Sequence, residues 1–371
     1  MAVTGHQARL FGLQRLVDDH GVDVRTTVLR VATDLFCQMN EHSPADIARY
    51  TELALPLLKT ADGATRRAVA EKLARHPHAP PRVLCELLDD RDVSVAAPVL
   101  EHSAALEKTN IAAFLAECGP AEAAALARRT DLDPASIRLV ASHRNEIVIE
   151  ALLENRRLVL DALATGLLVK RVQDHPNLVA LLLAHPGADA ADLSGLYPHA
   201  SPQKRAVIRQ ALANRRTPHA ASVPISALGA LNSAVQTQDR AGIGEALSNA
   251  LGLDAARMSL VLDEPTGEMF ALALLAAGIK RAPAVNILLV AAVPAVRTSV
   301  ARIFAAADLI EATPRHVARR IVAAVVGEQR AAPPFEPHMH DSGTPQRSAQ
   351  PRRRPLRPAL PARRIEIPGK G

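Results

Sequence analysis

Apolar residues recur along this chain with the period of an α-helix, in short runs separated by prolines and cap-forming polar residues. Between 64 and 75 they follow one helix face, and Pro81 then stands where a first-turn proline belongs. The segment "ARHPHAPP" (74–81) therefore ends one helix and begins the next. The same reasoning predicts further helix starts at Asp92, Gly119-Pro120, Asp133-Pro134, Asn145 and Ser201-Pro202.

The ends of the first helix in each predicted pair recur at a regular spacing. They fall at His76, His102, Arg129, Asn155, His185 and Asn214. The steps are 26 to 30 residues, shorter than is typical of HEAT repeats. One such helix pair cannot bury its apolar face alone, so neighbouring pairs must stack. The pattern predicts an all-α fold, a HEAT-like α-solenoid of helical hairpins.

Composition supports the helical prediction. The 371 residues are 48% hydrophobic but only 2% aromatic, so the core must be built from aliphatic side chains. The three cysteines (Cys37, Cys85 and Cys118) lie far apart, which favours small core residues over a disulfide framework or a zinc site.

Changes in pattern along the chain predict four segments. We expect an N-terminal helical cap at 1–40, the repeat array at 41–217 and a C-terminal helical module at 218–328. Residues 329–371 form a Pro/Arg-rich tail that we expect to be disordered. Residues 331–371 carry eight Lys or Arg and three acids, a net charge of +5, which leaves +1 for residues 1–330.

Two stretches resemble a known family. The segments "RRAVAEKLARHPHAPPRVLCELLDDRDVSVAAPVLEHSAAL" (66–106) and "LDEPTGEMFALALLAAGI" (262–279) are similar to a bacterial domain-of-unknown-function family with HEAT-like helical repeats. The resemblance covers residues 30–320. It implies a helical, cytoplasmic bacterial protein, and it carries over no catalytic residue.

Arginine pairs recur near the predicted turns between helices. If the repeats stack, these turns align along one edge and form a basic stripe suited to an acidic or phosphorylated partner. Cations near helix C-termini also complement the helix dipole and bond free carbonyls, which explains the pairs without a partner. The candidate partner-binding edge consists of Arg128, Arg129, Arg156, Arg157, Arg215 and Arg216.

Other polar clusters indicate structure rather than chemistry. The histidines at 76, 78, 102 and 185 lie on different repeats without a nearby acid or thiol, so we expect no metal site and interpret them as turn and C-cap residues. The acids of "LDEPTGE" (262–268) fit a turn before a helix. We expect no catalytic residues and no cofactor.

These observations favour a protein-interaction scaffold or regulatory adaptor without catalysis, whose partner is another protein. The alternative is a nucleic-acid-binding repeat protein that uses the basic tail and the arginine edge, although the near-neutral charge of residues 1–330 argues against it. An enzyme on a helical scaffold has the least support. The chain shows no signal peptide and no apolar run long enough for a membrane span, so we expect a cytoplasmic protein.

Overall fold

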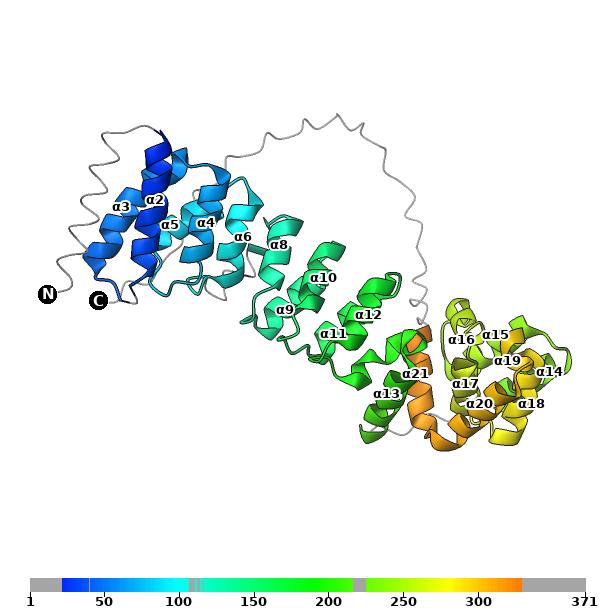
Figure 1. The fold of residues 1–371 in the computed structure, drawn as a ribbon. Coiled ribbons are helices and arrows are strands. Elements are labelled where there is room, and N and C mark those ends of the chain that lie inside the picture. The colour runs from blue at the N-terminus through cyan, green and yellow to red at the C-terminus, as the bar shows by residue number, and fades with distance from the viewer. Residues whose placement is uncertain are drawn as a thin grey trace, which may run out of the picture. The chain divides into compact units, whose positions relative to one another are not determined.

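The computed structural model describes residues 22–39, 41–106, 111, 114–115, 117–215 and 225–328 (Figure 1). The described residues form helices and no β-strand; their only β contacts are the isolated bridges Leu160–Ala188 and Leu253–Glu328. The predicted all-α fold is therefore confirmed. The predicted tail at 329–371, and residues 1–21 of the predicted N-terminal cap, lie outside the described residues.

The helices of the predicted repeat array are short and closely spaced. They are α2 (Val22–Cys37), α3 (Pro44–Thr60), α4 (Gly63–Leu73), α5 (Pro81–Leu88), α6 (Val93–His102), α8 (Pro120–Ala127), α9 (Pro134–Ala141), α10 (Glu146–Glu154), α11 (Ala162–Val172), α12 (Pro176–Ala184), the 3₁₀ helix η1 (Ala190–His199) and α13 (Pro202–Asn214).

A second set of helices follows after 224. They are α14 (Ile225–Gln236), α15 (Arg240–Leu251), the 3₁₀ helix η2 (Ala255–Arg257), α16 (Ser259–Leu262), α17 (Glu268–Ala276), α18 (Arg281–Ala291), α19 (Pro294–Arg297), α20 (Val300–Ala312) and α21 (Arg315–Val326).

Proline and polar caps set where the helices begin. Helix α5 starts at Pro81, and α9 starts at Pro134 behind Asp133, whose carboxylate accepts a hydrogen bond from the Ser136 amide. A proline at the first helical position costs nothing there, because its missing N–H has no partner in any case. The other predicted starts, at Asp92, Gly119-Pro120, Asn145 and Ser201-Pro202, are confirmed in the same way.

Helices that are two apart in the chain pack against each other. The even-numbered helices α2, α4, α6, α8, α10 and α12 contact one another in succession. Among the odd-numbered helices, α3 contacts α5 and α9 contacts α11, which in turn contacts η1. Figure 1 shows these helices following one another in chain order. The helices α4 and α6 retain exposed side chains, and so do α9 and α11.

The core is aliphatic, as composition predicts. One buried cluster extends from Val28 to Val99 and a second from Ala96 to Val326; Leu88 and Leu106 pack against both. Cys37, Cys85 and Cys118 are half-buried thiols. Burial raises the pKa of Cys37 to about 11, which keeps that thiol protonated and poorly nucleophilic at neutral pH.

Helix α17 is the centre of the C-terminal helices. Its residues 269–274 are all buried, and α15, α16, α18, α20 and α21 contact it. Helix α21 also packs against η1 and α13, so the C-terminal helices continue the core of the preceding ones.

Candidate interaction surfaces

Arg129, one of the six predicted edge arginines, is buried with 2% of its surface exposed. Its guanidinium donates to the carbonyls of Leu100 (2.9 Å) and Ser103 (3.1 Å) at the end of α6, and forms a bidentate pair with Asp131 at 2.8 Å. Arg129 therefore bonds the carbonyl end of α6, and its charge does not face solvent.

Asn155 and His185, at the next two predicted helix ends, also donate hydrogen bonds to backbone carbonyls of the preceding segment. The carboxamide of Asn155 donates to the carbonyls of Ala127 (3.1 Å) and Arg129 (2.7 Å). Nε2–H of His185 donates to the carbonyl of Asn155 at 3.2 Å. At Arg129, Asn155 and His185, the predicted helix ends thus coincide with a ladder of hydrogen bonds to backbone carbonyls 26 to 30 residues earlier.

Arg215 is also held within the fold. Its guanidinium lies 2.7 Å from a carboxylate oxygen of Asp189 and 2.6 Å from one of Asp192. These two acids raise the pKa of Arg215 above its ordinary value. Arg216 lies outside the described residues.

The remaining predicted edge arginines are exposed. Arg128 follows α8, and Arg156 and Arg157 lie in the turn before α11. None of the three forms an ion pair with a described residue. The structure therefore divides the predicted edge into bonded arginines (Arg129 and Arg215) and arginines that remain open to a partner.

An exposed apolar face lies directly beside Arg156 and Arg157. Val159 is 76% exposed, and on α11 Leu163 is 63% and Leu167 39% exposed. Leu139 on α9, the helix that packs against α11, is 47% exposed. Leu163 and Leu167 are one helical turn apart and share a side of α11. We call Leu139, Val159, Leu163 and Leu167 the α9–α11 face.

Gly166 lies between the two leucines in sequence and leaves a hollow on α11. A Cβ added to Gly166 would meet no atom within 4 Å. A glycine inside a helix lowers stability by roughly 0.5–1 kcal/mol relative to alanine, and no packing within the described fold requires it. The hollow is therefore space that the protein leaves open.

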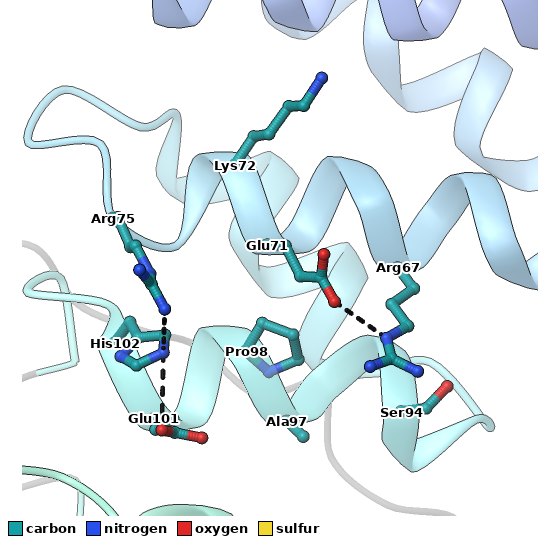
Figure 2. A pocket seen from close by; sticks show the side chains of 9 residues that line it. All are labelled: Arg67, Glu71, Lys72, Arg75, Ser94, Ala97, Pro98, Glu101 and His102. Carbon is teal, nitrogen blue, oxygen red and sulfur yellow. Dashed lines mark hydrogen bonds and ion pairs between the residues drawn. The ribbon is translucent and has the colours of Figure 1, made fainter.

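A second surface is the groove between α4 and α6, a cavity of about 500 Å³ (Figure 2). Figure 2 shows the side chains of α4 on one wall and Pro98 on the other, between Ser94 and Glu101. Within the groove Arg67 pairs with Glu71 at 2.9 Å, and the Arg75 guanidinium donates to Nε2 of His102 at 2.9 Å. Exposed pairs of this kind contribute little stability, so the groove is a polar, rearrangeable surface.

A bacterial family profile matches residues 95–323. The match covers more than half of the chain and includes the α9–α11 face, whereas α4 lies before it. The chain belongs to DUF2336, a family of uncharacterised proteins conserved in bacteria. The chain matches no curated protein and no solved structure.

The DUF2336 region also contains a buried polar cluster centred on Arg205. Arg205 is buried, and its guanidinium donates to Glu264 (3.1 Å), Thr266 (3.0 Å) and the carbonyl of Pro198 (2.7 Å). These bonds hold the "LDEPTGE" turn against η1. Glu268 accepts a hydrogen bond from the Tyr197 hydroxyl at 3.1 Å. The predicted turn is confirmed, and its carboxylates serve as partners of arginine and tyrosine.

Before the DUF2336 match, a cluster of rings packs the α2–α3 and α4–α5 turns. The imidazole of His42 stacks on Phe36 with 3.8 Å between ring centroids, and lies 5.1 Å from His76 and 6.4 Å from His78. Burial, reinforced by His76, lowers the pKa of His42. The described residues hold no group of three or more metal-binding side chains arranged to bind an ion.

The exposed leucines of α11 were not predicted, because its sequence "ALATGLLVKRV" is apolar on more than one side. Leu168, Val169 and Val172 are buried on the side opposite Leu163 and Leu167. The sequence did contain a signal for this exposed face: α11 has more apolar residues than a single buried stripe can hold. None of the described helices is both long and apolar enough to cross a membrane.

Proposed function

We propose that this DUF2336 protein is a non-catalytic interaction module that binds a segment of another protein on the α9–α11 face. The supporting observation is the exposure of Leu139, Leu163 and Leu167 on two helices that contact each other, and of Val159 in the turn before α11. Adjacent exposed aliphatic side chains mark interaction sites more often than scattered ones do. Fully burying one leucine contributes about 1.5–3 kcal/mol, so two or three suffice to anchor a partner.

We also propose that the helices within residues 22–215 form a HEAT-like array. Two features support it: helices two apart pack against each other, and the Arg129–Asn155–His185 ladder repeats at steps of 26 and 30 residues. Such arrays present extended surfaces for partners. The family's bacterial distribution and the lack of a membrane-spanning helix among the described ones are consistent with our proposal of a cytoplasmic location.

Nucleic-acid binding has less support from the same residues. Arg129 is buried and Arg215 faces two carboxylates, so neither offers a free cation to a phosphate. The phosphate backbone dominates such binding, so each predicted edge arginine that is used within the fold reduces the support for it.

Site-specific photocrosslinking tests the proposal. A photoreactive amino acid is placed at position 163 of the full chain, which is then expressed in bacteria and irradiated. The matched control places it at position 304, where Phe304 is equally exposed but lies on α20. We expect a defined crosslinked protein from position 163 and not from position 304. If position 163 yields no crosslink, or only those that position 304 yields, the proposal is wrong.

A further inference from the structure

The α9–α11 face has a basic border at both ends. Arg156 and Arg157 are exposed immediately before Val159, and Lys170 and Arg171 are exposed in the last turn of α11. The eleven residues of α11 span about 16 Å, or three helical turns, at 1.5 Å per residue; one basic pair precedes the helix and the other lies in its last turn. A bound segment must meet positive charge at either end of its apolar contacts.

Three acids lie near this face, and none forms an ion pair with its basic residues; one of them is Glu154, exposed at the end of α10. Asp161 caps α11 and pairs with Arg138 at 2.5 Å, which uses its charge within the fold. Asp174 is exposed beyond the C-terminal end of α11. Arg156, Arg157 and Lys170 form no ion pair with a described residue, and Arg171 donates only to the carbonyl of Ser142, at 3.2 Å.

The hollow at Gly166 favours a helical occupant. Ridges of side chains on one helix pack into grooves on another, and the missing Cβ of Gly166, beside Leu163 on α11, leaves room for such a ridge. A helix also supplies apolar anchors at i, i+3, i+4 and i+7, which fit a row of exposed leucines.

Building on the function proposed above, we propose that the partner segment is an amphipathic helix of about three turns, with apolar residues in its middle and acidic residues at both ends. Its apolar side chains pack over Leu139, Leu163 and the Gly166 hollow. Its carboxylates meet Arg156 and Arg157 at one end and Lys170 at the other.

Two synthetic peptides test the charge and the helix together. Both have 16 residues, blocked ends and the same leucines at i, i+3, i+4 and i+7; one carries Glu at its ends and the other Lys. Binding to the full chain is measured by fluorescence anisotropy at low and moderate salt. We expect the Glu peptide to bind at least tenfold more tightly than the Lys peptide, with the difference shrinking as salt rises.

Variants of the full chain locate the binding. R156E R157E should reduce the preference for the Glu peptide at least fivefold, whereas the control R82E R91E, two exposed arginines at α5 and just after it, should leave it unchanged. G166L, which fills the hollow, should weaken both peptides. Binding of neither peptide, equal affinities, or a preference that R156E R157E leaves unchanged overturns the inference.

The two proposals fail separately. A crosslink from position 163 together with peptides that bind without charge preference refutes the acidic helix and leaves the docking function standing. A charge preference that survives in an L163D L167D variant shows that the peptides bind elsewhere, and refutes this inference as well.

Discussion

The carboxamide of Asn155 donates a hydrogen bond, at 2.7 Å, to the carbonyl of Arg129, the residue 26 positions earlier at the preceding predicted helix end. Arg129 in turn donates to carbonyls at the end of α6. Arg129 and Asn155, which follow the ends of α8 and α10, therefore also satisfy backbone carbonyls of the preceding segment, which would otherwise lack these donors. This relationship explains why the spacing of helix ends is visible in the sequence.

Removing the Asn155 carboxamide should destabilise the protein. N155A leaves the carbonyls of Ala127 and Arg129 without these donors, and each unsatisfied buried group costs about 1–3 kcal/mol. We expect a loss of about 2 kcal/mol in the free energy of unfolding, measured with urea. The control N177A, at an exposed position of α12, should change it by less than about 0.5 kcal/mol. Equal effects of the two variants would refute the ladder.

Replacing the neighbours Arg128 and Arg129 one at a time should have different effects on stability, because Arg129 is buried and Arg128 is exposed. R129M removes a buried guanidinium that donates five hydrogen bonds to two backbone carbonyls and Asp131, and should lower the unfolding free energy by about 2 kcal/mol or more. R128M, at the exposed neighbour, should stay within about 0.5 kcal/mol. Thermal unfolding of both variants checks this, and a stable R129M protein would contradict the structural role of Arg129.

Gly166 should tolerate alanine with a gain in stability. No atom lies within 4 Å of the added Cβ, so G166A should stabilise the chain by about 0.5–1 kcal/mol through helix propensity. At Gly195 the same change should destabilise it, because its Cβ would lie 2.7 Å from Val169 Cγ1. Differential scanning calorimetry distinguishes the two signs. A destabilised G166A protein would show that the hollow is already occupied.

Stability should fall in mild acid. The pKa of His42 is lowered from its ordinary value of 6.5, so the fold favours the neutral ring; its contribution is complete above pH 6.5 and is lost as pH falls through the lower, folded pKa. The groups facing His42 are His76 and His78 from the α4–α5 turn and Asp46 of α3. His185 shifts in the same direction.

The H42F variant isolates that contribution. Between pH 7 and pH 5, the free energy of unfolding in urea should fall less in H42F than in the natural protein. The loss that remains in H42F includes the contribution of His185. The control H316Q, on α21, should lose stability as the natural protein does. Identical pH profiles for H42F and the natural protein would refute the role of the His42 stack.

Local chemistry made much of the fold predictable. Pro81, Asp92 and Asp133 begin helices for reasons that lie within a few residues of each, and the sequence places them correctly. The burial of Arg129 was not predictable, because it depends on carbonyls 26 and 29 residues earlier. The alternative explanation of the arginine pairs was that they bond free carbonyls at helix C-termini. That explanation describes the bonds of Arg129, but it does not predict that the carbonyls belong to α6.

The exposed face of α11 was hidden for a different reason. Both Leu163 and Leu168 look like core residues in the sequence, and only packing against α9, α12 and η1 decides which side is buried. Arg156 and Arg157 were predicted as partner contacts from their position at a turn, and that role stays a prediction. The structure adds the exposed Val159 beside them.

One measurement addresses the central claim most directly: the yield of photocrosslinking from position 159, next to the α9–α11 leucines, in cells that express the full chain as L163D L167D. Both leucines are exposed, so this variant should fold, which its thermal unfolding verifies. The account predicts a yield below a tenth of that from the unsubstituted chain, while V300D F304D on α20 keeps the full yield. An undiminished crosslink in a folded L163D L167D protein would contradict it.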